Sequence, residues 1–292
     1  MPRAALLSIH ARVEGAHPSS WEDKSLVQVW GPRFSTYVVP ASDHAIFTLG
    51  RHPDDARGRE WAEDLAARLH AFLAGRQATD NEAQAALGVG GVRRATTTGT
   101  VLIRWEGARA PLVWTVPKPE LDPLEARHEL ARRYLHVFGP TTSASFAIWA
   151  GIGAKEARTA FDGIDLTPVR TPIGEAWILS GDEALIREPA GPVAAARLLP
   201  SGDAYWLLQG RDRELLVPDA KQRAALWTPR VWPGAVLVAG EIAGTWRRAH
   251  ADLSIEPWRR LTRAEREAIE TEAASLPLPG LEREVAVRWE TG

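Results

Sequence analysis

The sequence of 292 residues contains no cysteine. Disulfide bonds, thiolate nucleophiles and thiolate metal ligands are therefore excluded. The chain also lacks an apolar run long enough to cross a bilayer, and it does not open with a charged segment followed by an apolar one. We therefore expect a cytoplasmic protein without a membrane partner.

A surplus of positive charge is missing as well, because the formal net charge is −2. Proteins that bind nucleic acid through many phosphates usually show a basic surplus. Only four of the 35 basic residues are lysines, which leaves 31 arginines. Arginine is the better ligand for phosphates and base edges, but a GC-rich coding sequence also enriches it, and we favour the second explanation. The positions of the arginines therefore matter more than their number.

Signatures of common cofactors are absent too. The sequence has no phosphate-binding P-loop, no Gly-x-Gly-x-x-Gly motif after a strand, and no zinc-type spacing among its eight histidines. No cofactor and no metal site is therefore predicted. The length is sufficient for several small domains.

The most informative segment is residues 122–181, which predicts a winged helix-turn-helix unit. Helices are expected at residues 123–138, 143–150 and 154–161, and the two strands of a wing at 166–170 and 175–179. Gly139 ends the first helix and Thr142 caps the second. The third helix carries Lys155 and Arg158, which we predict to contact DNA.

The preceding segment repeats this plan. Helices are expected at residues 59–73 and 79–87, a third short piece at 91–98, and two strands at 101–105 and 111–116. The third piece carries Arg93 and Arg94, which are also predicted to contact DNA. Residues 59–181 are therefore predicted to form tandem winged helices. The alternative is that such modules serve as dimerisation or scaffold elements without contacting DNA.

Beyond residue 188 the pattern changes to short apolar runs separated by glycine and proline, which predicts a small β-rich domain. Strands are expected at residues 195–199, 204–208, 215–217, 235–238, 241–246 and 284–289, and a helix at 261–275. Arg211 and Arg213 lie between strands and could contact a phosphate, although an ion-paired surface loop is equally expected.

Four segments carry a resemblance to a known family. They are residues 27–40 (VQVWGPRFSTYVVP), 131–151 (ARRYLHVFGPTTSASFAIWAG), 198–203 (LLPSGD) and 240–247 (GEIAGTWR). Together they resemble the winged-helix DNA-binding proteins that include the AlkZ and YcaQ DNA glycosylases. The resemblance implies an α+β fold in which tandem winged helix-turn-helix domains precede a small β-barrel-like C-terminal domain. The expected domains are residues 1–58 (a partial first winged helix), 59–119, 120–188 and 189–292.

The resemblance also implies a function. Characterised members of that family resemble monofunctional glycosylases that release alkylated or bulky-adducted purines. Duplex DNA is therefore the expected partner, and no obligate protein partner is expected. Such enzymes commonly flip the modified nucleotide out of the duplex. A protein that keeps the winged helices but binds DNA without releasing a base is the alternative.

The catalytic signature of the family is Gln-x-Gln or Gln-x-Asp at the end of an early helix, and its two positions correspond here to His10 and Arg12. A histidine can take a proton from water or orient it near neutral pH. Arg12 cannot act as a base but could bind a flanking phosphate. Glu14 is the carboxylate that could substitute if the register is shifted. A structural or DNA-contacting role for His10 is the alternative.

A second family pattern, Arg-x-Thr-x-His near the first wing, reads Arg33 to Tyr37 here. The resemblance implies that Arg33 contacts the DNA backbone. Tyr37 could stack on DNA or form a hydrogen bond, but a place in the core of a strand is the favoured expectation.

Overall fold

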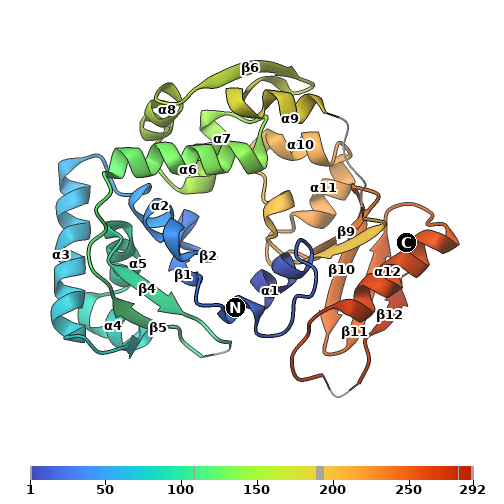
Figure 1. The fold of residues 1–292 in the computed structure, drawn as a ribbon, viewed down its shortest axis with the longest axis horizontal. Helices are drawn as coiled ribbons and strands as arrows, with labels where there is room; N and C mark the ends of the chain where they lie inside the picture. The colour runs from blue at the N-terminus through green and yellow to red at the C-terminus, as the bar shows by residue number, and fades with distance from the viewer. Residues whose placement is uncertain (1, 108, 189–193, 282, 291–292) are drawn as a thin grey trace. The chain divides into compact units, whose positions relative to one another are not determined.

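The computed structural model describes residues 2–107, 109–188, 194–281 and 283–290 (Figure 1). It is a mixed α+β protein made of two compact units. The first unit consists essentially of Glu22–Glu183, and the second joins Arg3–Trp21 to Ala184–Gly292. The four domain boundaries drawn from the sequence stay a prediction. No helix within the described residues is long and apolar enough to span a membrane.

The first unit begins with two antiparallel strands and a short helix. These elements are β1 (Leu26–Trp30), β2 (Thr36–Pro40) and α2 (His44–Leu49). Residue Val29 lies opposite Tyr37 in the hairpin. The connection includes Arg33 and Phe34, whose φ angles of 53° and 56° place both in the left-handed region. This conformation is uncommon for residues other than glycine, so the connection is a strained turn.

The next segment of the first unit forms three helices and three strands. They are α3 (Ala56–Leu73), β3 (Ala78–Thr79), α4 (Asp80–Leu87), α5 (Gly91–Ala95), β4 (Val101–Arg104) and β5 (Leu112–Thr115). Thr79 and Glu82 form a capping box that fixes the start of α4. The strands join the first hairpin in one sheet with the order β2-β1-β4-β5-β3. The apolar faces of α3, α4 and α5 meet in one core, which includes Leu69, Leu87 and Val92.

The last segment of the first unit confirms the predicted helices and strands to within one residue or so. It contains α6 (Pro123–Phe138), α7 (Ser143–Ala150), α8 (Ala154–Asp162), β6 (Leu166–Thr171) and β7 (Gly174–Leu179). Asp122 caps α6 and Thr142 caps α7, because their side-chain oxygens accept backbone N–H groups. An isolated bridge pairs Thr141 with Trp177 of β7.

Within the described residues, the second unit contains a sheet of five strands together with five α-helices and short 3-10 helices. The α-helices are α1 (Pro2–His10), α9 (Glu183–Arg187), α10 (Arg213–Leu216), α11 (Ala220–Leu226) and α12 (Arg263–Ser275). The 3-10 helices include η6 (Ala204–Trp206) and η7 (Gly210–Asp212). The strands are β8 (Ala196–Leu199), β9 (Gly234–Val238), β10 (Glu241–Ala249), β11 (Asp252–Pro257) and β12 (Ala286–Trp289).

Two expectations for the second unit were wrong. The runs 204–208 and 215–217, predicted as strands, form η6 and part of α10 instead. The reason at the first run is local, since Asp203 accepts the backbone N–H of Tyr205 and so starts a helical turn. The described strands follow the order β12-β11-β10-β9-β8, which leaves two edges, so they form an open sheet and not a closed barrel.

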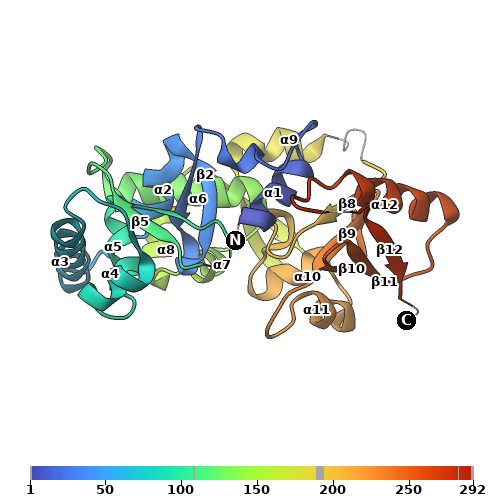
Figure 2. The ribbon, with the colours of Figure 1, turned by 90° about the horizontal axis from the view of Figure 1, so that it is seen from below.

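The core of the second unit lies between α12 and this sheet (Figure 2). Ile269 and Ala273 of α12 pack against Leu198, Leu253 and Ile255. Helix α1 joins the same core through Leu7, which is 4% exposed. The start of the chain is therefore held by strands and a helix from its last hundred or so residues.

Candidate active site in the second unit

The site is built around the end of α1, where His10 is the last helical residue. Leu6 and Leu7 are buried and anchor the helix. The side chains that follow on neighbouring turns, Ser8, His10 and Arg12, make polar contacts with the rest of the unit. The apolar residues of α1 thus fix the direction of the signature side chains.

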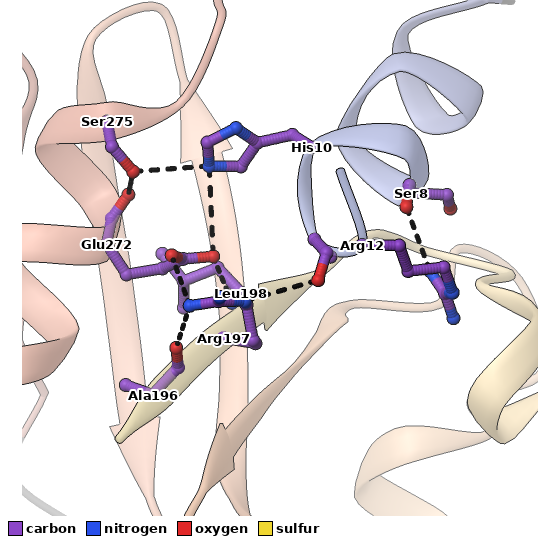
Figure 3. A network of polar contacts seen from close by, with 9 residues as sticks. Ser8, His10, Arg12, Ala196, Arg197, Leu198, Glu272 and Ser275 are labelled. Atoms are coloured by element: carbon purple, nitrogen blue, oxygen red, sulfur yellow. Dashed lines mark hydrogen bonds and ion pairs between the residues drawn. The ribbon is translucent and has the colours of Figure 1, made fainter. Parts of the chain in front are cut away.

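The imidazole of His10 faces α12. Its Nε2 lies 3.2 Å from the hydroxyl oxygen of Ser275 and 4.0 Å from Oε1 of Glu272. Figure 3 shows the other ring nitrogen pointing away from both residues. The histidine side chain is only 13% exposed, so these contacts hold the ring in one orientation.

The hydrogen bonds of Ser275 suggest an assignment for the proton of neutral His10. The Ser275 hydroxyl donates its single hydrogen to the backbone oxygen of Glu272 at 2.8 Å. With this assignment of the hydroxyl hydrogen, its oxygen accepts from His10, and the proton of neutral His10 is assigned to Nε2. Nδ1 therefore keeps its lone pair, and no described residue forms a hydrogen bond with it. A water molecule at Nδ1 could transfer a proton to the ring.

Glu272 ties this end of α1 to the sheet. It is 7% exposed, and its carboxylate accepts the backbone N–H of Leu198 at 3.2 Å and the guanidinium of Arg197 at 3.3 Å. Arg197 also donates to the backbone oxygen of Ala11. A cavity of about 260 Å³ lies beside these groups, lined by Ala195, Ala196, Arg197, Ala268, Thr271, Glu272 and Ser275.

Arg12 is paired with a buried carboxylate. Its two terminal nitrogens donate to the two oxygens of Asp203 at 2.9 and 2.7 Å. The Asp203 side chain is 0% exposed, whereas that of Arg12 is 45% exposed. Ser8 donates its hydroxyl to the same carboxylate at 2.6 Å. The hydrogen bond with Asp203 raises the pKa of Arg12, so its charge is held in place and balanced.

Glu14 does not join this network. It lies in the turn after α1 and is exposed, and none of the described residues forms an ion pair or side-chain hydrogen bond with it. The structure thus places both predicted signature positions, His10 and Arg12, in polar contacts of the second unit and leaves the predicted substitute, Glu14, outside them.

The predicted DNA contacts of the first unit divide into exposed and stacked side chains. Lys155 and Arg158 are both exposed on α8. Arg93 and Arg94 lie at the end of α5, where each guanidinium is over an aromatic ring. Arg33 is exposed in the strained turn between β1 and β2.

Tyr37 packs in the interior of the first unit. Its ring lies 5.9 Å from that of Phe47 and 6.4 Å from that of Trp149. Burial raises the pKa of Tyr37 to about 12, so the phenol is neutral at physiological pH. These contacts agree with the favoured expectation of a strand-core residue.

The two predicted contacts of the second unit differ from each other. The Arg211 side chain is 71% exposed and approaches Glu214 only at 3.8 Å. Arg213 lies over the rings of Trp227 and Trp232 and donates to the backbone oxygen of Leu208 at 2.9 Å. Arg213 therefore stabilises its own loop, while Arg211 projects into solvent.

Sequence reasoning did not identify the partners of the signature residues. Ser275 is 265 residues away from His10, and Asp203 is 191 residues away from Arg12. Asp203 lies in one of the four segments that carry the family resemblance, and this was the available signal. No pattern in the sequence pointed to Glu272 and Ser275, because they lie in a segment whose apolar spacing predicts only an ordinary helix. The described residues contain no group of three or more side chains suited to bind a metal ion.

Comparisons with known proteins place the chain in a family. The family model described as DNA glycosylase AlkZ-like matches residues 1–277. An interstrand DNA cross-link repair glycosylase from Streptomyces sahachiroi is 30% identical over 162 residues, which are 52% of this chain and 42% of that protein. The match thus spans less than half of the relative's length.

The fold is also similar to that of a solved structure. The Streptomyces sahachiroi DNA glycosylase AlkZ superposes with a TM-score of 0.77 and 20% identity, over 99% of this chain and 89% of that one. At this identity the likeness concerns the fold. With the family match over nearly the whole chain, the chain belongs to the AlkZ-like DNA glycosylase family.

Proposed function

We propose that this protein binds duplex DNA and excises alkylated or bulky-adducted purines by hydrolysing the N-glycosidic bond. Membership of the AlkZ-like DNA glycosylase family supports this proposal. The name of the Streptomyces relative, which acts in repair of interstrand cross-links, supports a bulky adduct as the substrate. The observation that carries the proposal is the orientation of His10, whose Nδ1 keeps a lone pair while Nε2 is held by Ser275.

The proposed reaction uses this lone pair. The bond between C1′ and the base breaks, and its electrons go to the base, which an alkyl group has made a better leaving group. Water adds to C1′ and gives its proton to Nδ1 of His10. The resulting imidazolium lies 4.0 Å from the Glu272 carboxylate, which stabilises the positive charge.

Arg12 has a different role in this scheme. Its ion pair with Asp203 balances the guanidinium charge, so Arg12 does not oppose the positive charge that develops on the sugar. The exposed part of Arg12 is proposed to contact the phosphate next to the lesion. Glu14 is the alternative base if DNA binding moves the turn that follows α1.

The first unit is proposed to supply the DNA-binding winged helices. In the segment from α3 to β5, and again in the segment from α6 to β7, three helices precede a two-stranded hairpin. The second strand of each hairpin also pairs with residues just before the second helix: β5 pairs with β3, and Trp177 of β7 forms a bridge with Thr141. The third helices, α5 and α8, carry Arg93 and Arg94, and Lys155 and Arg158. These side chains, together with Arg33 and Arg211, are the proposed contacts with DNA.

The test is incubation with a duplex that carries 7-methylguanine, followed by alkaline cleavage of abasic sites. A second duplex carries a bulky purine adduct. We expect strand breaks with the unmodified protein and a loss of about 10² to 10⁴-fold in His10→Ala, the range typical of a general base. His10→Gln restores the residue usual in the family and should retain more activity than His10→Ala. His17→Ala is the matched control, because His17 is an exposed histidine of the same segment. Equal release by His10→Ala and the unmodified protein would contradict the mechanism.

The second candidate is a DNA-binding protein without base release. One observation favours it: both signature positions are engaged in contacts that also serve the fold, His10 with Ser275 and Arg12 with Asp203. Absence of abasic product from both duplexes, together with salt-sensitive binding, would support this candidate.

A further inference from the structure

Three arginines of the first unit gather around aromatic rings. The guanidinium carbon of Arg51 lies 4.4 Å from the centre of the Phe34 ring, and that of Arg94 lies 5.8 Å from the same centre. Arg94 also lies 4.6 Å from the centre of the Trp61 ring. We call Arg51, Phe34, Arg94 and Trp61 the arginine stack. Arg93, next to Arg94, lies over Trp30 at 5.7 Å.

The stack begins in the interior and ends at the surface. Arg51 is 5% exposed and donates to the backbone oxygens of Ala150 and Trp30 at 2.8 and 3.2 Å. Trp61, at the other end, is 51% exposed on α3. Arg94 lies between the two and is partly exposed. A solvent-borne ligand can therefore reach the charge of Arg94.

The arginines of the stack lack an ion-paired carboxylate within the part of the chain that the structure describes. Neither Arg51, Arg93 nor Arg94 forms an ion pair with a carboxylate anywhere in the described ranges. Burial lowers the pKa of Arg51 to about 10, and the charge of Arg94 acts in the same direction, yet Arg51 stays protonated at neutral pH. Burial mainly raises the pKa of Asp80, and Arg93 counteracts part of this rise without forming an ion pair with it. The cations Arg51 and Arg94 repel each other, so an anionic ligand would relieve this repulsion.

A contrast within the same unit shows that a buried arginine here can have an acidic partner. Arg127 is 0% exposed, and its guanidinium contacts Asp54 at 2.6 Å. Among the described residues, the buried Arg51 thus differs from the buried Arg127 in having no ion-paired carboxylate.

We propose that the arginine stack, with Arg93 beside it, is a binding site for a backbone phosphate of DNA and does not read base edges. The rings of Phe34 and Trp61 hold the guanidinium of Arg94, which leaves its in-plane N–H groups to bind phosphate oxygens. A side chain that reads bases must instead extend into a groove. This inference rests on the proposed function only in taking DNA as the partner.

Salt dependence of duplex binding tests the proposal. The affinity for an unmodified duplex is measured between roughly 50 and 200 mM salt, where each phosphate contact adds about 0.9 to the slope of log K against log salt. Arg94→Gln should lower the slope by about 0.9 and the affinity by about eightfold at about 0.1 M salt. Arg93→Gln should act in the same direction. The loss should be equal on A·T-rich and G·C-rich duplexes.

Two further variants separate charge from packing. Trp61→Leu removes an exposed ring but no charge, so the affinity should fall while the slope stays unchanged. Arg68→Gln is the matched control, since Arg68 is a half-exposed arginine of the same helix that pairs with Asp64 at 3.5 Å. It should leave both quantities unchanged. Thermal unfolding of each variant checks that the first unit is intact.

The outcomes distinguish this proposal from the proposed glycosylase function. An unchanged slope in Arg94→Gln, with base release by the unmodified protein intact, overturns the phosphate site alone. A lower slope without base release by the unmodified protein supports the phosphate site and contradicts the glycosylase. A loss confined to one duplex sequence shows base reading and overturns the inference. Absence of duplex binding by the unmodified protein at the lowest salt overturns both.

Discussion

Replacement of Arg12 by alanine should destabilise the second unit, because it leaves the carboxylate of Asp203 buried without a counter-charge. The change removes two hydrogen bonds, of 2.9 and 2.7 Å, from a side chain that is 0% exposed. Breaking a buried ion pair costs about 3 to 5 kcal/mol. Arg12 is itself 45% exposed, and Asp203 keeps its hydrogen bonds with Ser8 and Tyr205. We therefore expect a decrease of about 2 kcal/mol in the free energy of unfolding.

The assay is urea-induced unfolding followed by circular dichroism, with the transitions of the two units fitted separately. Arg263→Ala is the control, because Arg263 is 91% exposed and pairs with Glu267 on the surface. Its effect should stay within about 0.5 kcal/mol. In the double variant Arg12→Ala/Asp203→Asn, the loss should be smaller than the sum of the single losses by about 1 kcal/mol. The reasoning is refuted if Arg12→Ala is no more destabilising than Arg263→Ala.

Two further predictions concern stability. Arg127→Ala should lower the free energy of unfolding by about 3 kcal/mol in urea titrations. The change empties a buried site and leaves the backbone oxygens of Gly50 and His52 without their donor. A loss below about 1 kcal/mol would contradict this account. The hydrogen bond from Arg259 lowers the pKa of Glu265 from 4.5 to about 2, so its stabilising contribution is complete above about pH 4.5 and is lost as the pH falls towards 2. Glu265→Gln should make the decrease of Tm over this pH range shallower, and an unchanged profile would show that the pair is not responsible.

Local signals made the last segment of the first unit predictable. Asp122 and Thr142 have side chains that cap helices, and the apolar spacing between them has the period of a helix. The same reasoning failed at residues 204–208, where a short apolar run favoured a strand. There Asp203 starts a helical turn, and Trp206 is fully buried. The local hydrogen bond of one aspartate therefore outweighed the pattern.

The candidate site was predictable only in part. The family resemblance pointed to His10 and Arg12, but no pattern along the chain indicates that Glu272 and Ser275 meet the end of α1. Such contacts depend on how distant segments pack, which a single sequence does not encode in its local spacing. The arginine stack shows the same limit. Arg94 was predicted to contact DNA, whereas the positions of Phe34, Arg51 and Trp61 around it follow from the folded sheet and helices.

The packing of α1 with the last part of the chain has a consequence for protein synthesis. The hydrogen bond between His10 and Ser275 spans 265 residues, so α1 leaves the ribosome long before its partners exist. At about 5 to 20 residues per second, the delay is roughly 15 to 50 s. During this time Leu7 is without the core that buries it in the finished protein. The first unit can complete its folding within this interval, whereas the nascent α1 must be kept from aggregation until the final helix and strands appear.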